Sequence, residues 1–147
     1  MNSGINGKAK GKDVYYSITW SALRKADRWE IAKSVPAVGG VYEIYWMDER
    51  KHLRLLSVAG ANFGGLRSEI RRFTDPELID DERAAEILTN REIFFRYAES
   101  DSAAAMADIV WFFRKTYFPE NPGVSHSGRY ERIFLNENAP DKVRWVE

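Results

Sequence analysis

The fold is decided by residues 39–46, which read Gly-Gly-Val-Tyr-Glu-Ile-Tyr-Trp. Along this stretch Val, Glu and Tyr alternate with Tyr, Ile and Trp, and a period of two predicts a strand over residues 40–46. A polar turn at 48–51 follows, and residues 53–60, Leu-Arg-Leu-Leu-Ser-Val-Ala-Gly, form a more continuously apolar run. Such a run is typical of a central strand that is covered on both faces. We therefore predict that residues 40–46 and 53–59 pair as an antiparallel hairpin.

Helical patterns follow this hairpin. Residues 65–73, Gly-Leu-Arg-Ser-Glu-Ile-Arg-Arg-Phe, place three apolar side chains on one face, which predicts a basic helix packed on the sheet. Thr74 and Glu77 form a capping-box pattern, which predicts a second helix running to about residue 88. A third strand is predicted over residues 92–98, and we expect it to join the sheet of the hairpin.

The longest predicted helix runs from about Ser102 to Tyr117. The Ser-Asp-Ser sequence at 100–102 can cap its start, and Pro119 marks its end. Apolar side chains recur at helical spacing along it and are expected to lie against the sheet: Met106, Ile109, Val110 and Phe113. The remaining predicted elements are a strand over 14–19, a helix capped by Thr19 or Ser21, and short strands over 133–135 and 143–146.

Length and composition indicate a single ordinary core. The chain has 147 residues, of which 44% are hydrophobic, and this is enough for one core and too little for two. We expect one domain over residues 13–147, preceded by a disordered basic tail over residues 1–12 in which glycines alternate with lysines. The tail lacks the residue spacing of a Walker phosphate loop. The predicted fold class is α+β, a small and mainly antiparallel sheet flanked by helices.

Charge and cysteine content limit the partners. The 22 Lys and Arg residues equal the 22 Asp and Glu residues in number, so attraction to DNA or RNA has to come from a local patch. The chain has no cysteine, which excludes disulfides and thiolate metal sites. No stretch has the apolar character of a signal peptide or a membrane span. We therefore expect a cytoplasmic protein with no membrane partner.

The order of these elements resembles the core of the GIY-YIG nuclease superfamily. In that family a Gly-x-Tyr strand pairs with a Tyr-x-Gly strand, and a helix with an essential arginine follows. Tyr42 matches the first motif and Gly60 matches the end of the second. The aromatic strand at 94–98 and the Ser-capped helix that ends near Pro119 continue the series. The resemblance covers residues 36–122 and implies a GIY-YIG-like fold.

The resemblance also implies metal-dependent hydrolysis of phosphodiesters. In such chemistry a tyrosine helps to activate water, an arginine stabilises charge on the phosphate and a carboxylate holds a divalent metal. On this chain the resemblance assigns the tyrosine to Tyr42, the arginine to Arg67 or Arg71 and the metal ligand to Asp108. An active enzyme of this kind would use Mg²⁺.

Three departures set this chain apart from the family pattern. The second motif reads Val-Ala-Gly at 58–60, so an isopropyl group stands in place of a phenol. When Leu66 and Ile70 are aligned with the family's apolar positions, Glu69 stands where the arginine belongs and repels phosphate. Asp108 is shorter than the family's glutamate. We therefore expect no cleavage and no cofactor.

The residues leave three functions open. The first, which we favour, is a catalytically degenerate GIY-YIG-like domain that binds DNA, RNA or a protein, with Arg67, Arg71 and Arg72 as the nucleic-acid contacts. The second is an active Mg-dependent endonuclease whose catalytic groups have moved. The third is a small-molecule or structural module, because 5 Trp, 7 Tyr and 8 Phe residues can line a pocket as well as a core. His52 and His126 lie far apart in polar segments and are expected at the surface.

Overall fold

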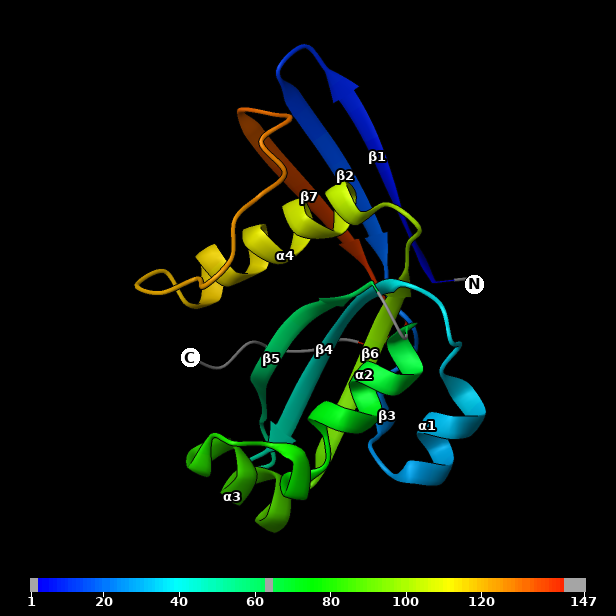
Figure 1. The fold of residues 1–147 in the computed structure, drawn as a ribbon, viewed down its shortest axis with the longest axis vertical. Coiled ribbons are helices and arrows are strands. Elements are labelled where there is room, and N and C mark those ends of the chain that lie inside the picture. The colour runs from blue at the N-terminus through cyan, green and yellow to red at the C-terminus, as the bar shows by residue number, and fades with distance from the viewer. Residues whose placement is uncertain (1–2, 63–64, 142–147) are drawn as a thin grey trace.

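The computed structural model describes residues 3–62 and 65–141 and contains two β-sheets (Figure 1). The four-stranded sheet has the order β3-β6-β4-β5. Its strands are β3 (Arg24–Lys25), β4 (Gly40–Met47), β5 (Leu53–Ala61) and β6 (Ile93–Glu99). β4 pairs antiparallel with β5 on one side and with β6 on the other. The predicted hairpin and the predicted third strand are therefore confirmed, and the fold class is α+β.

The three-stranded sheet joins the two ends of the described chain. It has the order β1-β2-β7, with β1 (Gly4–Lys10), β2 (Asp13–Thr19) and β7 (Arg132–Asn138). β1 pairs antiparallel with β2, whereas β2 runs parallel to β7. The strands predicted over 14–19 and 133–135 belong to this sheet. The strand predicted over 143–146 lies outside the described residues.

The prediction of a disordered tail over residues 1–12 is wrong for residues 4–10, which form β1. All seven residues of β1 pair with residues of β2. A tight turn joins the two strands, and Gly11 adopts a positive φ of 63° in it, a conformation that glycine accepts without a steric penalty. The polar composition was misleading because one face of this sheet points to solvent, where lysines at alternate positions do not oppose backbone pairing.

The first and longest helices differ in how well their caps were predicted. α1 (Arg28–Ser34) begins after Asp27, whose carboxylate accepts hydrogen bonds from two backbone amides of the first turn. This cap corrects the prediction that Thr19 or Ser21 begins the helix. α4 (Ala103–Tyr117) begins after Ser102, whose hydroxyl accepts a hydrogen bond from the amide of Ala105 at 3.1 Å. The predicted start and end of this helix are confirmed.

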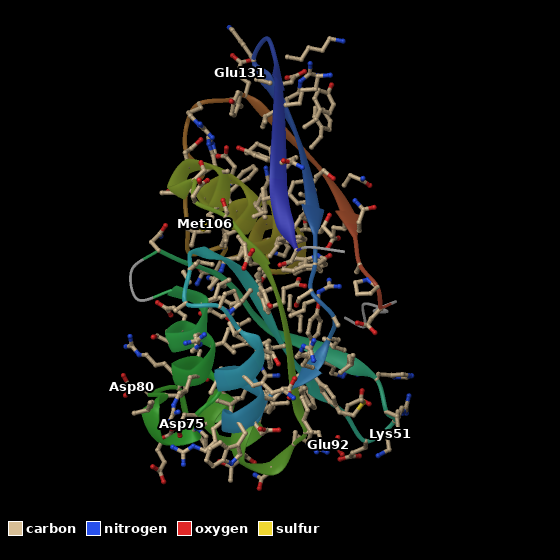
Figure 2. All side chains as sticks on the ribbon, turned by 90° about the vertical axis from the view of Figure 1, so that its right-hand side faces the viewer. Lys51, Asp75, Asp80, Glu92, Met106 and Glu131 are labelled. Atoms are coloured by element: carbon tan, nitrogen blue, oxygen red, sulfur yellow. The ribbon has the colours of Figure 1, made fainter. Side chains whose placement is uncertain are left out.

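The segment between α2 (Gly65–Phe73) and β6 forms two short elements where one helix was predicted. A single 3₁₀ turn, η1 (Pro76–Leu78), is capped by Asp75, and α3 (Glu82–Asn90) is capped by Asp81. Thr74 does not act as the predicted cap because its hydroxyl donates a hydrogen bond to the carbonyl of Ile70 at 2.7 Å. The acidic side chains of this segment, including Asp75 and Asp80, lie at the periphery of the molecule (Figure 2).

α4 lies where the two sheets meet (Figure 1). Its four predicted core residues are buried in one cluster with apolar side chains from both sheets: Met106, Ile109, Val110 and Phe113. A second cluster lies on the other face of the four-stranded sheet, where residues of α1, α2 and α3 cover it. Of the helices in the described segments, none combines the length and apolar character needed to cross a bilayer.

Replacing Phe113 by alanine should lower the free energy of unfolding by about 3–5 kcal/mol, the usual cost of removing a well-buried phenylalanine. Phe113 is 1% exposed, and its ring centroid lies 5.9 Å from that of Trp20 and 6.1 Å from that of Tyr117. Phe118→Ala is the matched control, because Phe118 is 38% exposed, and it should cost less than about 1 kcal/mol. Urea denaturation measures both; equal losses would show that α4 packs through a different face.

Candidate functional site

Tyr42, the residue to which the resemblance assigns the catalytic tyrosine, lies on β4. It is 1% exposed and belongs to the cluster between the four-stranded sheet and the helices. Burial raises the pKa of Tyr42, and so do the charge of Glu69 and a hydrogen bond that the Tyr42 hydroxyl donates to it, whereas the charges of Arg114 and Arg72 lower it. We call these four side chains the Tyr42 cluster. They come from β4, α2 and α4.

No second phenol faces Tyr42 from β5. Val58 is fully buried in the cluster that contains α4, on the opposite face of the sheet from Tyr42. Across the hairpin, Tyr42 pairs with Ala59. Because successive side chains of a strand point to opposite faces, even a tyrosine at position 58 would point away from Tyr42.

The arginines of α2 have different surroundings. Arg67 donates from Nε to the carbonyl of Val35 at 2.7 Å, which joins α2 to the residue after α1. Arg71 and Arg72 are exposed. The charged groups with the largest effect on Tyr42 include Arg72 and neither Arg67 nor Arg71. Among the charged groups of α2, Glu69 and Arg72 therefore affect the pKa of Tyr42, rather than the two arginines assigned to catalysis.

Arg114 is a member of the cluster that the sequence did not reveal. Its Nε donates to the carbonyl of Val58 at 3.0 Å and its Nη1 donates to the carbonyl of Pro122 at 3.1 Å. It also lines a hollow of about 550 Å³ together with Tyr117 and Phe118. A basic residue in the last turn of a helix is common because it interacts favourably with the helix dipole, so its position carried no functional signal.

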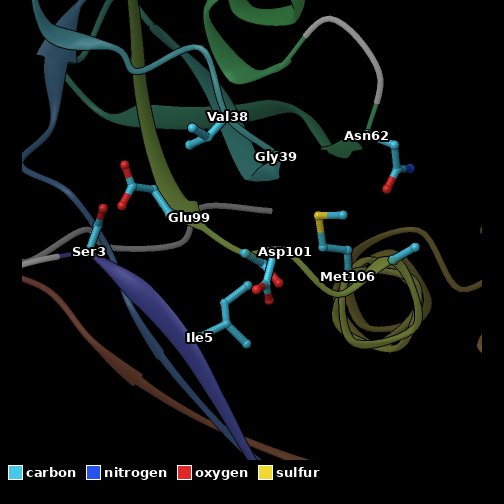
Figure 3. Close-up of a pocket in the computed structure, with 10 residues that line it drawn as sticks. Ser3, Ile5, Val38, Gly39, Asn62, Glu99, Asp101 and Met106 are labelled. Atoms are coloured by element: carbon cyan, nitrogen blue, oxygen red, sulfur yellow. The ribbon is translucent and has the colours of Figure 1, made fainter.

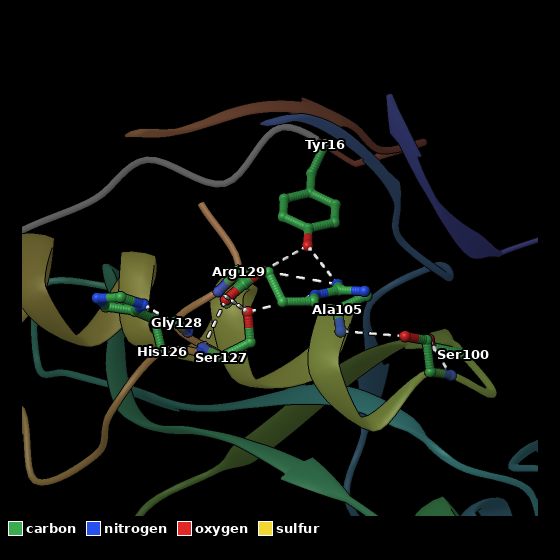
Figure 4. A network of polar contacts seen from close by, with 9 residues as sticks. Tyr16, Ser100, Ala105, His126, Ser127, Gly128 and Arg129 are labelled. Carbon is green, nitrogen blue, oxygen red and sulfur yellow. Dashed lines mark hydrogen bonds and ion pairs between the residues drawn. The ribbon is translucent and has the colours of Figure 1, made fainter. Parts of the chain in front are cut away.

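Asp108 lies in a different network, and its partners Tyr16, Ser127 and Arg129 are labelled in Figure 4. Its Oδ2 accepts a hydrogen bond from the Tyr16 hydroxyl at 2.5 Å and lies 3.8 Å from Nη2 of Arg129, while its Oδ1 accepts from the amide of Ser127 at 2.8 Å. Asp108 is fully buried and joins α4 to β2 and to the loop before β7. The partners of Asp108 differ from those of Tyr42, so the structure does not bring the two predicted catalytic groups together.

The surroundings of Asp108 do not fit a Mg²⁺ ion. Both of its oxygens accept hydrogen bonds from protein donors, and a guanidinium lies beside the carboxylate. A divalent cation is normally held by oxygen ligands, with no competing cation at the same carboxylate. Within residues 3–62 and 65–141, no group of three or more His, Asp or Glu side chains could hold a metal ion.

The two histidines lie at the surface, as expected. The Nδ1 of His126 accepts a hydrogen bond from the amide of Gly128 at 3.0 Å, and its ring meets that of Trp111 edge-on at 4.9 Å between centroids. Both contacts hold the loop before β7 in shape.

A second buried polar group joins the two sheets and was not foreseen. Arg96 donates from Nε to Oε1 of Glu43 at 2.6 Å, and the Tyr45 hydroxyl donates to the same oxygen at 2.8 Å. Arg96 also lies 3.6 Å from Glu137 of β7, which accepts a hydrogen bond from the Trp20 indole at 2.8 Å. We call these five residues the inter-sheet network. Glu43 is fully buried, and its Oε2 accepts no hydrogen bond from the described residues.

A hollow of about 650 Å³ opens between β1, β4 and the start of α4 (Figure 3). Its charged side chains are carboxylates, Glu99 at the end of β6 and Asp101 in the loop before α4. Met106 supplies an apolar wall. Because two carboxylates repel phosphate, this hollow does not suit a nucleic acid.

Comparison with known proteins identifies the family of the chain and little else. A family model described as "Uncharacterised protein" matches residues 5–147, and the chain belongs to that family. A search of curated proteins and a search of solved structures found no match to this chain.

The inter-sheet network should make stability depend on pH. Burial raises the pKa of Glu43 to about 7, although the charge of Arg96 opposes this shift. The folded state therefore binds this proton more tightly than the unfolded state, so the free energy of unfolding should fall as pH rises from about 4.5 to about 7. The slope for one proton is at most about 1.4 kcal/mol per pH unit.

Urea denaturation between about pH 5 and pH 8 measures this slope. Glu43→Gln should flatten it, whereas Glu49→Gln, which changes a side chain that is 82% exposed, should leave it as in the parent protein. The same slope in the parent and in Glu43→Gln would show that another group titrates.

Proposed function

We propose that this chain, as a member of that family, is a GIY-YIG-like domain that binds nucleic acid and does not cleave it. The single observation that carries the absence of cleavage is that the Glu69 carboxylate, by its charge and a hydrogen bond, raises the pKa of the Tyr42 hydroxyl, which burial also raises. When α2 is aligned with the corresponding helix of the GIY-YIG family, Glu69 takes the position of the arginine that holds phosphate. A phosphate group that approaches Tyr42 would meet a negative charge at that place.

The likeness to the nuclease superfamily rests on the order of elements. β4 lies between β5 and β6 in one antiparallel arrangement. α2 follows β5 after a short connection, and α4 follows β6. This is the succession in which the resemblance places the tyrosine strand, its partner strand, the arginine helix and the last helix.

The Tyr42 cluster is poorly suited to proton transfer. A general base or acid works best when its pKa lies near the working pH, and both burial and Glu69 move the pKa of Tyr42 upward from its ordinary value. Arg114 adds positive charge nearby, but two of its nitrogens already donate to backbone carbonyls. Tyr42 is better explained as a packed residue between the sheet and the helices on its face, since it belongs to the same buried cluster as Leu66 and Ile70 of α2.

The exposed side of α2 supplies the local positive charge that binding needs. Arg71 and Arg72 are exposed, and no ion pair found among the described residues involves either of them. Such arginines can contact phosphates without first breaking an internal pair, and phosphate contacts of this kind do not depend on base sequence. A protein partner becomes the better proposal if no nucleic acid binds.

Purified protein with excess Mg²⁺ or Mn²⁺ should cleave neither duplex nor single-stranded DNA above background. The reason is the combination of Glu69, which the resemblance puts in place of the phosphate-binding arginine, with a buried Tyr42 whose pKa is raised. Gel electrophoresis of labelled DNA measures cleavage, with Tyr42→Phe as the comparison. Metal-dependent cleavage that Tyr42→Phe abolishes would contradict the proposal and support an active nuclease with relocated groups.

Binding to duplex DNA should be weak, should decrease with added salt and should depend on α2. Replacing Arg71 and Arg72 together by glutamine should reduce the salt-dependence slope by about 1 to 2, because each lost phosphate contact removes about 0.9. The matched control is Arg67→Gln, which should change stability by about 1 kcal/mol through loss of the hydrogen bond to Val35 and should change the slope less. Fluorescence anisotropy at several salt concentrations measures the slopes. If Arg67→Gln has the larger effect on the slope, the assignment is wrong.

A further inference from the structure

The three-stranded sheet has one face that α4 covers and one face that is open. Val14, Tyr16 and Ile18 of β2 are buried toward α4. Since side chains alternate along a strand, Asp13, Tyr15 and Ser17 point to the other face. The registers place residues of β1 and β7 beside them on that face: Asn6, Lys8 and Lys10 of β1, and Arg132, Phe134 and Asn136 of β7. We call this set of nine residues the open face.

Two aromatic rings stand together at the centre of the open face. Tyr15 and Phe134 are partners in the parallel register, and their rings stack with centroids 4.9 Å apart and planes at 11°. Tyr15 is 45% exposed and Phe134 is 41% exposed. Phe134 lies on the edge strand β7, with no strand beyond it in the sheet, whereas Lys8 is the neighbour of Tyr15 on the side away from Phe134. Adjacent exposed aromatic rings on a sheet are unusual for a surface that meets only water.

The charge around the rings is positive. Lys8 lies opposite Tyr15 in the register, and Lys10 lies one pleat farther along β1. Neither lysine forms an ion pair within the described part of the chain. The acid of the open face, Asp13, is bound by Arg132 through two hydrogen bonds of 2.9 Å. Phosphate groups near the rings would therefore meet two uncompensated ammonium groups.

These features together select one class of partner. A ligand that offers flat rings for stacking and negative charge for the lysines has the chemistry of a nucleic acid. In a duplex the bases stack on one another and are not available to side chains, whereas in a single strand they can be splayed onto aromatic rings. The side chains of Asn6, Ser17 and Asn136 add hydrogen-bonding groups of the kind that contact base edges.

We propose that the open face binds single-stranded nucleic acid, with bases stacked on Tyr15 and Phe134 and phosphates near Lys8 and Lys10. This surface is separate from the arginines of α2, since it belongs to the other sheet. The proposal therefore does not depend on the nucleic-acid binding proposed above for the arginines of α2. A second copy of the chain is the competing occupant of two exposed aromatic rings.

Fluorescence anisotropy with a labelled oligothymidylate of about ten nucleotides tests the proposal, because non-specific sites of this kind span roughly 4–16 nucleotides. Tyr15→Ala and Phe134→Ala should each raise Kd by about tenfold, the effect of losing about 1.4 kcal/mol of stacking. Tyr15→Phe should keep the parent Kd, because it retains the ring. The matched control is Trp29→Ala, because Trp29 is 80% exposed on α1, and this change should leave Kd unaltered. Replacing Lys8 and Lys10 by glutamine should lower the single-strand salt slope by about 1.4.

Several results would overturn the inference. One is no binding of the oligonucleotide by the parent protein, and another is an unchanged Kd in both alanine variants when circular dichroism shows that they are folded. An equal loss in Tyr15→Phe and Tyr15→Ala would also contradict stacking. If sedimentation shows a dimer that Phe134→Ala dissociates while the oligonucleotide does not bind, the open face is an interface between copies. If only the variant that lacks Arg71 and Arg72 loses binding to duplex DNA, the loss concerns the α2 surface. Such a loss does not bear on single-strand binding by the open face.

Discussion

The structure depends on one buried, hydrogen-bonded pair of polar side chains, Glu43 of β4 and Arg96 of β6. The two residues are direct partners in the antiparallel register and have almost no exposed surface. The guanidinium of Arg96 also lies 4.5 Å from the centre of the Trp20 ring, and it approaches Glu137 of β7. A charge in a protein interior requires a partner and hydrogen bonds in correct geometry. The relative position of the two sheets is therefore constrained by this group.

A second buried carboxylate has a similar role at the other end of the junction. Asp108 of α4 accepts hydrogen bonds from Tyr16 of β2 and from Ser127 in the loop before β7. The junction of the two sheets is therefore filled by apolar packing and by groups whose polar atoms are mostly paired with one another. The four-stranded sheet is covered on both faces, which makes Tyr42 part of the interior. The two proposed binding surfaces, the outer side of α2 and the open face of the three-stranded sheet, lie outside this packed interior.

Local patterns in the sequence were sufficient for the elements whose residues contact their near neighbours or a continuous core. The period of two from Val41 to Trp46 identified β4, and most side chains on both faces of this strand are buried. α4 was identified by its cap, Ser102, and by the spacing of Met106, Ile109 and Phe113. The cap and the buried residues are close together in the sequence, so a local pattern contains both. The errors fell on polar segments. β1 resembles a disordered tail in composition, and the aspartates that begin α1, η1 and α3 compete with several other possible caps.

The sequence by itself determined the hairpin, the third strand, the longest helix and the α+β class, since each depends on periodicity within a short window. Only the tertiary structure decided which side chains meet. Glu43 and Arg96 are 53 residues apart, Tyr16 and Asp108 are 92 residues apart, and Trp20 and Glu137 are 117 residues apart. The parallel pairing of β2 with β7, and with it the stacking of Tyr15 on Phe134, likewise joins distant segments. No local pattern records such contacts, because hydrogen bonding and stacking act between groups close in space, whatever their separation along the chain.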